Sequence, residues 1–193
     1  MIIQAKNILI LAAIAGTLSL YSCKENKEKN DAPEPMQNET HEGEMGSQMK
    51  DEIGMDQTTA EFKDLATAAV YNHYIAIKTA LVQTDAELAQ DHAKQMIAEL
   101  ENTEANAEIV IVARNIATST NVNEQREAFS ELTKFMGGIL EGALKSGEIY
   151  KQYCPMAFEG KGDFWYSNSK EIRNPYFGDM MLKCGRVEAT ITN

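Results

Sequence analysis

A long stretch without proline is the feature that most constrains the fold of this chain. Residues 57–150 contain neither proline nor cysteine. Apolar residues recur there every three or four positions, the spacing that gathers them on one face of a helix. The pattern predicts helices over about 60–83, 85–101 and 104–118, and a fourth that begins near residue 123. Because short connections favour antiparallel neighbours, we predict a mostly α fold built on an up-down four-helix bundle.

Three sites carry residues that typically begin helices. A capping box pairs a serine or threonine side chain with a glutamate or glutamine three residues later. Two pairs have this spacing and a third, with asparagine first, is a weaker version: Thr58 with Glu61, Thr84 with Glu87, and Asn121 with Glu124. We therefore expect Thr58, Thr84 and Asn121 to cap the first, second and fourth helices.

Two histidines lie on the apolar stripes of the first two predicted helices. His73 precedes Thr84 by 11 residues, and His92 follows it by 8. At a rise of about 1.5 Å per residue, their levels on adjacent helices differ by roughly 5 Å, so the two rings can share one site. The alternative is that each ring is hydrogen-bonded to a neighbour at the edge of the core. A haem between them is disfavoured, since the chain has no Cys-x-x-Cys-His sequence.

Residues 1–23 have the pattern of an export signal. Lys6 supplies the positive charge, and residues 8–20 form an uncharged stretch that is too short to span a bilayer. The end of this stretch, Leu20-Tyr21-Ser22-Cys23, resembles a bacterial lipobox, although Tyr21 is an uncommon occupant of its position. We expect lipidation of Cys23, a membrane anchor, and a cell-envelope location as a periplasm-facing or outer-membrane lipoprotein. An ordinary secretory signal is the alternative.

The next segment, residues 24–56, predicts a disordered acidic tether. It has no aromatic residue, and it holds four lysines against ten acidic residues. Such a composition cannot bury enough apolar surface to fold. It also contains side chains that bind copper well, although a linker in which they have no role is equally compatible: Met36, His41, Met45, Met49 and Met55. The third predicted part, residues 57–193, is the helical bundle with a C-terminal cap.

The C-terminal cap, residues 151–193, differs in composition from the bundle. It holds half of the chain's 14 aromatic residues, five sulfur-containing side chains and two prolines. The pattern predicts a turn and short strand over residues 158–167 and a final short strand over residues 187–191. Residues 179–183 fit a helical turn that Gly185 stops. We therefore expect an irregular, aromatic-rich cap with short β-strands.

The sulfur atoms of the cap have the spacing of a soft-metal site. Cys154 and Met156 flank Pro155, while Met181 and Cys184 share one face of the predicted turn, with Met180 as a weaker candidate. Two thiolates and one or two thioethers suit Cu(I) and disfavour magnesium, calcium and, with so few cysteine or histidine ligands, zinc.

Two further side chains and one rival pairing bear on this site. Lys183 and Arg186 are expected to favour the thiolate forms. A Cys154–Cys184 disulfide that closes a loop of about 30 residues is the alternative, and it would stabilise the fold by about 3–4 kcal/mol. Spacing alone leaves the metal site and the disulfide nearly equal. His73 or His92 would complete or neighbour the metal site if the cap packs on that end of the bundle.

Long motifs in the cap carry a resemblance to a known family. They are Tyr-Cys-Pro-Met over residues 153–156, Trp at 165, Asn-Pro-Tyr-x-Gly over 174–178, and Met-Leu-x-Cys-Gly over 181–185. With parts of the helical region, they resemble the bacterial periplasmic domain-of-unknown-function family numbered three-three-four-seven over about residues 60–188. The resemblance implies export, often as a lipoprotein. It also implies kinship with domains fused to adaptor subunits of copper/silver-type heavy-metal efflux systems, and so heavy-metal binding and hand-off.

These observations favour one class of function and disfavour others. The expected protein is an exported lipoprotein that binds Cu(I) for sequestration or hand-off to an efflux system. The alternative is a metal-free envelope interaction module with a disulfide-stapled cap, in which residues 174–178 form a docking turn. No Ser-His-Asp set or phosphate loop is recognisable, so we expect no enzyme. The net charge of −11 argues against a nucleic-acid partner, which leaves the membrane, an efflux adaptor or another envelope protein.

Overall fold

The computed structural model describes residues 59–103 and 107–193. The predicted signal peptide, the lipidation site Cys23 and the predicted tether lie outside the described residues. Within the described part, no helix combines the length and the apolar character needed to cross a membrane.

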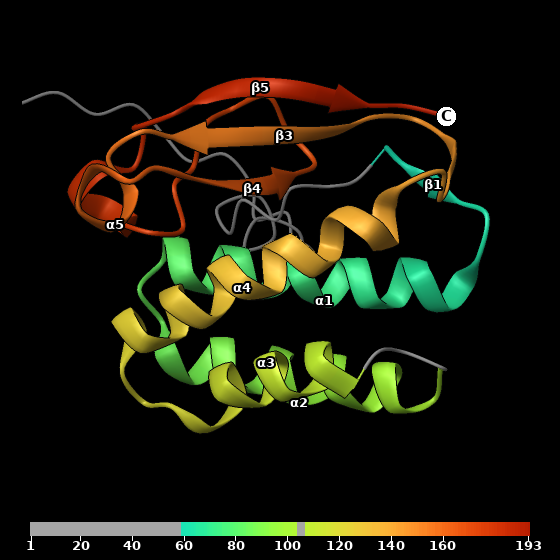
Figure 1. Ribbon diagram of the computed structural model, residues 1–193, viewed down its shortest axis with the longest axis horizontal. Helices are drawn as coiled ribbons and strands as arrows, with labels where there is room; N and C mark the ends of the chain where they lie inside the picture. The colour runs from blue at the N-terminus through green and yellow to red at the C-terminus, as the bar shows by residue number, and fades with distance from the viewer. Residues whose placement is uncertain (1–58, 104–106) are drawn as a thin grey trace, which may run out of the picture. The chain divides into compact units, whose positions relative to one another are not determined.

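Four helices form the scaffold. They are α1 (Leu65–Val82), α2 (Ala86–Glu101), α3 (Ala107–Thr118) and α4 (Val122–Leu140). Each packs mainly on the next along the chain, and α4 also contacts α1 (Figure 1). The predicted up-down four-helix bundle is therefore confirmed. Its core holds the fully buried Met96, Met136 and Phe129.

The helix caps were predicted with mixed success. Asn121 caps α4 as expected. Thr58 lies outside the described residues, and α1 is capped instead by Asp64, whose carboxylate accepts the Thr67 N–H at 2.7 Å. Asp85 caps α2 in place of Thr84, which adopts a left-handed φ of 60° just beyond α1. Aspartate is as good an N-cap as threonine, so the capping-box spacing does not distinguish Thr84 from its neighbour Asp85.

Two small antiparallel sheets complete the fold. Strands β1 (Glu61–Phe62) and β2 (Leu144–Ser146) pair where a helix had been predicted to begin. The larger sheet has the order β4-β3-β5, with β3 (Ile149–Cys154) between β4 (Asp163–Ser167) and β5 (Arg186–Ile191). The two outer strands were expected, whereas the central strand was missed. Two short helical turns, α5 (Ala157–Gly160) and η1 (Gly178–Met181), lie in its connections.

The larger sheet packs on α1 and α4 through strand β4. Figure 1 shows the sheet on the side of these two helices that faces away from α2 and α3. Strand β4 is an edge strand, paired with β3 alone. The backbone N–H of Tyr166 donates to the Tyr74 hydroxyl at 3.0 Å, and the backbone carbonyl of Phe164 accepts from the Tyr176 hydroxyl at 2.6 Å. The Tyr74 ring stacks on Phe129 at 4.9 Å between centroids. Tyrosine hydroxyls therefore satisfy backbone groups that an edge strand would otherwise leave unpaired.

Candidate functional site

The structure brings Cys154 and Cys184, here named the thiol pair, into contact. Cys154 ends the central strand and is fully buried, whereas Cys184 lies between η1 and β5 and is partly exposed. Both are free thiols, and their Sγ atoms are 2.9 Å apart. The antiparallel register of β3 and β5, which places Tyr153 opposite Arg186, sets this proximity. The two cysteines are therefore neighbours although 30 residues separate them in the chain.

An asparagine clamp holds the loop that carries Cys184. The side-chain amide of Asn174 donates to the Cys184 carbonyl at 2.9 Å, and its oxygen accepts the Tyr176 N–H at 2.9 Å. The Asn174 backbone N–H donates to the Leu182 carbonyl at 2.8 Å, and the Cys184 N–H to the Met181 carbonyl at 3.0 Å. Asn174 is fully buried, so a single side chain fixes both ends of this loop.

A buried arginine ties the same loop to the helices. Arg126 of α4 donates to the Pro175 carbonyl at 2.9 Å and to the Leu81 carbonyl at 3.2 Å. Residues 174–176 and Gly178 are all buried. The expected docking turn at residues 174–178 is therefore wrong, because this segment packs inside the protein and offers little surface to a partner.

The methionines of the predicted site differ in their contacts with the thiol pair and in their exposure. Backbone hydrogen bonds link both Met156 and Met181 to Cys184. Met156 is 52% exposed and Met180 is 76% exposed. Among residues 59–103 and 107–193, no cluster of three or more His, Cys, Asp or Glu side chains could hold a metal. Among these described residues, the methionine thioethers are therefore the remaining candidates for a further ligand beside the thiol pair.

The electrostatic surroundings favour the neutral form of Cys184. The hydrogen bond with Cys154, with burial, raises the pKa of the Cys184 thiol above its ordinary value. The expectation that Lys183 and Arg186 would favour the thiolate is therefore wrong for this residue. Arg186 instead lies over the Tyr153 ring at 4.9 Å and pairs with Glu188 at 2.9 Å.

The distance between the two sulfur atoms lies between the distance in a disulfide and the distance expected when both sulfurs bind one metal ion. A disulfide needs about 2.05 Å, and two metal–sulfur bonds of about 2.3 Å place the sulfurs roughly 4 Å apart. The observed 2.9 Å therefore requires a movement of about 1 Å in either direction. Cys154 is held in the central strand, so the movement would fall mainly on Cys184, which lies outside any helix or strand.

The two predicted histidines meet each other rather than the thiol pair. The ring centroids of His73 and His92 are 6.4 Å apart on the α1–α2 seam. On α1, Tyr71 donates a hydrogen bond to Asn168, which follows β4, and Lys78 donates one to Ser167, the last residue of β4. The structure thus confirms the expected proximity of the two histidines.

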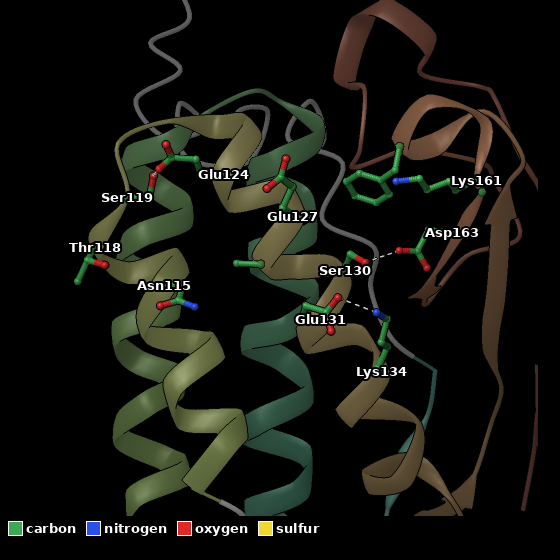
Figure 2. Close-up of a pocket in the computed structure, with 13 residues that line it drawn as sticks. Asn115, Thr118, Ser119, Glu124, Glu127, Ser130, Glu131, Lys134, Lys161 and Asp163 are labelled. Carbon is green, nitrogen blue, oxygen red and sulfur yellow. Dashed lines mark hydrogen bonds and ion pairs between the residues drawn. The ribbon is translucent and has the colours of Figure 1, made fainter.

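One open cavity escaped the sequence-based expectations. It has a volume of about 990 Å³ and lies between the ends of α3 and α4 and the turn from α5 to β4. Figure 2 shows carboxylates on its walls, including Glu127, Glu131 and Asp163, together with Lys134 and Lys161. Glu131 and Lys134 pair at 2.6 Å. Glu127 and Glu131 lie on exposed positions of α4, and Asp163 begins strand β4, so no pattern in the sequence singled the three out.

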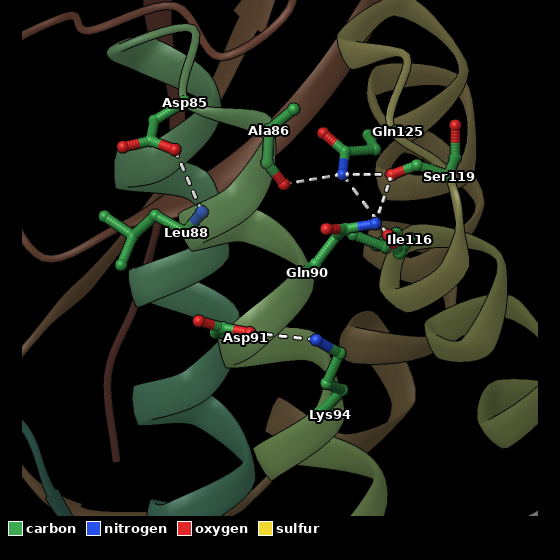
Figure 3. A network of polar contacts seen from close by, with 9 residues as sticks. All are labelled: Asp85, Ala86, Leu88, Gln90, Asp91, Lys94, Ile116, Ser119 and Gln125. Atoms are coloured by element: carbon green, nitrogen blue, oxygen red, sulfur yellow. Dashed lines mark hydrogen bonds and ion pairs between the residues drawn. The ribbon is translucent and has the colours of Figure 1, made fainter.

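A buried glutamine was also missed. The side-chain amide of Gln125 donates to the carbonyls of Ala86, Ile116 and Ser119, at 2.9, 3.3 and 2.8 Å (Figure 3). Gln90 donates to the same Ser119 carbonyl at 3.0 Å. These bonds join α2, α3 and α4 at one end of the bundle. The available signal was a polar residue on the apolar face of the fourth helix.

These features define the structural class of the protein, which is a four-helix bundle with a small antiparallel sheet that carries the thiol pair. Residues 70–146 match the model of a family described as "Protein of unknown function (DUF3347)", so a DUF3347 domain is present in the chain. The resemblance is confirmed for this region, which runs from α1 to β2, whereas the cap lies beyond the matched residues. No curated protein and no solved structure matches the chain.

Proposed function

We propose that this chain is an exported lipoprotein that binds a soft heavy metal, first of all Cu(I), through Cys154 and Cys184. The proposal rests on one observation, the contact of two free thiols at 2.9 Å. Thiolate and thioether ligands select Cu(I) over harder cations. Bound metal is sequestered or passed to a heavy-metal efflux system, the context that the resemblance implies.

The two sulfurs have different parts in this proposal. Cys154 is the fixed ligand, because it belongs to the central strand and is fully buried. Cys184 is the mobile ligand, which separates from Cys154 as the ion enters. Met156, whose backbone is hydrogen-bonded to the Cys184 sulfur and whose side chain is half exposed, supplies a thioether from the solvent side. Met181 is the second thioether candidate.

Protons must leave as the metal binds. Metals bind thiolates, and the pKa of Cys184 is raised, first by its hydrogen bond with Cys154. Binding through both sulfurs therefore releases up to two protons per ion, and the apparent affinity rises with pH. This proton release is a signature that adventitious binding to exposed methionine lacks, because a thioether carries no proton.

The envelope location and the partners belong to the same proposal. Cys23 would carry the lipid anchor that binds the membrane, and the methionine-containing segment 24–56 would capture the ion loosely. An efflux adaptor, or another envelope protein, would receive it. The acidic net charge of −11 suits cation capture and disfavours nucleic acid.

A metal-free interaction module is the second candidate, and the same thiol contact favours it. An oxidising envelope would convert the thiol pair into a disulfide that closes a loop of about 30 residues and stabilises the fold by about 3–4 kcal/mol. In this case the cap is stapled, and the protein acts through an interface with another envelope protein.

Anaerobic titration of the reduced full-length chain with Cu(I) tests the first candidate. Trp165, the single tryptophan, is an intrinsic reporter because its ring lies beside Gly185, next to Cys184. We expect one ion per chain and at least a tenfold loss of affinity in both Cys154→Ser and Cys184→Ser. Cys23→Ser is the matched control and should bind as the unmodified chain does.

Two results would separate the candidates. Unchanged stoichiometry and affinity in both serine variants would refute metal binding at the thiol pair. A complete Cys154–Cys184 disulfide, found by mass measurement after alkylation and stable to physiological reductant, would favour the interaction module.

A further inference from the structure

A histidine pair lies on the seam between α1 and α2. His73 and His92 are each partly buried, and their rings are 6.4 Å apart between centroids with an interplanar angle of 37°. Half-buried rings on facing helices are held by packing, and they remain accessible from one side. The pair is thus a preformed arrangement of two imidazoles that the thiol site does not use.

One ring nitrogen of the pair lacks a partner. The Nδ1 atom of His92 is buried and has no hydrogen bond in the described part of the chain. A buried polar atom without a partner is costly and uncommon in folded proteins. An ion bound at this nitrogen would remove that cost.

The distance between the rings fits one shared ion. Metal–nitrogen bonds are about 2.0–2.1 Å long, and a ring nitrogen lies roughly 1 Å from its centroid, so two rings on opposite sides of an ion have centroids about 6 Å apart. The observed 6.4 Å lies close to this value. The separation of the two rings is therefore compatible with one shared ion.

The charge state of the rings also suits a ligand role. Burial, with a smaller effect of His92, lowers the pKa of His73 and favours the neutral imidazole, which is the form that binds metals. The Glu99 carboxylate acts on His73 in the opposite sense, so it lies close enough to offset part of the charge of a cation.

We propose that His73 and His92 bind one divalent transition-metal ion between α1 and α2, at a site separate from the thiol pair. Imidazole suits copper, zinc and nickel, and the general order of affinity places Cu²⁺ above Zn²⁺. The described residues hold no cluster of three His, Cys, Asp or Glu ligands, so the two imidazoles are the side-chain ligands of the proposed site. The site does not depend on the proposed Cu(I) function, because it uses different ligands and a different class of ion.

The test uses Zn²⁺ and Cu²⁺ salts with the full-length chain carrying Cys154→Ser and Cys184→Ser, so that failure of the thiol site cannot affect the result. We expect one ion per chain, tighter binding of Cu²⁺ than of Zn²⁺, and at least a tenfold loss of affinity in His73→Asn and in His92→Asn. The matched control is Asn72→Ala, an exposed residue of α1 next to His73, which should not change this binding. Absence of binding, or an affinity in both histidine variants equal to that of the chain with His73 and His92 intact, would overturn the proposal.

A second measurement on the unmutated chain covers the case in which a variant fails to fold. Zn²⁺ should protect His73 and His92 from modification by diethylpyrocarbonate, with at least a fivefold slower reaction read by peptide mass analysis. Equal modification rates with and without Zn²⁺ would show that the pair is purely structural.

Discussion

Replacing the buried Arg126 with methionine tests whether the helices hold the cap in place. Arg126 as a whole residue is 4% exposed. Its guanidinium group donates to the Pro175 carbonyl at 2.9 Å, the Leu81 carbonyl at 3.2 Å, the Thr84 hydroxyl at 3.1 Å and the Asn123 side-chain oxygen at 3.2 Å. Methionine fills much of the same volume and donates no hydrogen bond, so Arg126→Met removes all four contacts at once.

The expected cost follows from the partners that are left behind. A buried acceptor that loses its donor costs about 1–3 kcal/mol. We expect the largest cost at the Pro175 carbonyl, because its hydrogen bond with Arg126 is the shortest of the four. The Leu81 carbonyl keeps a bond from the Thr84 N–H at 3.2 Å, so its loss is smaller. Burial lowers the pKa of Arg126, because the charged guanidinium group is partly removed from water. Replacing it with neutral methionine relieves this desolvation cost and offsets part of the destabilisation. We expect a net destabilisation of about 3 kcal/mol.

Urea unfolding of the full-length chain provides the measurement. Arg114→Met is the matched control, since Arg114 is 60% exposed and only pairs with Glu101 at 3.4 Å, and it should cost at most about 0.5–1 kcal/mol. The loop released by Arg126→Met also carries Cys184, so the alkylation rate of Cys184 should rise several-fold. A cost below about 1 kcal/mol, or one equal to that of Arg114→Met, would refute the reasoning.

Three further predictions concern the bundle. Gly138→Ala in α4 should raise stability by about 0.5–1 kcal/mol because nothing lies within 4 Å of the new Cβ, whereas Gly137→Ala should gain less, since its Cβ would lie 3.1 Å from the Tyr166 hydroxyl; urea midpoints compare the pair. Asp85→Ala removes the α2 cap and should cost about 1 kcal/mol in the same assay. Burial raises the pKa of Tyr74 well above 10.0, so unfolding free energy should fall as pH rises above about 10; Tyr74→Phe should flatten that fall, and an unchanged slope would contradict this.

The local pattern of the sequence determined the helical part of the fold. The spacing of apolar residues, with the absence of proline over residues 57–150, depends on forces that act within one or two turns of a helix. Hence α1 to α4 were predicted to within a few residues, and Asn121 was identified as a cap. The alternation of Val187, Ala189 and Ile191 likewise predicted strand β5.

The central strand β3 was missed because its local sequence is not typical of a strand. Its residues 151–153 are Lys-Gln-Tyr, which show no clear apolar alternation. They form a strand because β4 and β5 pair with them on both sides, and pairing between distant segments is a tertiary effect that propensity does not describe. The buried Asn174 and Arg126 were missed for the same reason, since polar residues are usually exposed and only their partners explain their burial.

The contact between Cys154 and Cys184 was decided by the tertiary structure alone. The sequence supplied two cysteines, a disulfide alternative and a metal alternative, and it left open whether the residues meet. The register of β3 against β5, together with the Asn174 clamp, brings their sulfurs to 2.9 Å. A local pattern identifies which residues can react, whereas strand pairing across some 30 residues decides which of them lie within reach, because that pairing is selected by the packing of the whole domain.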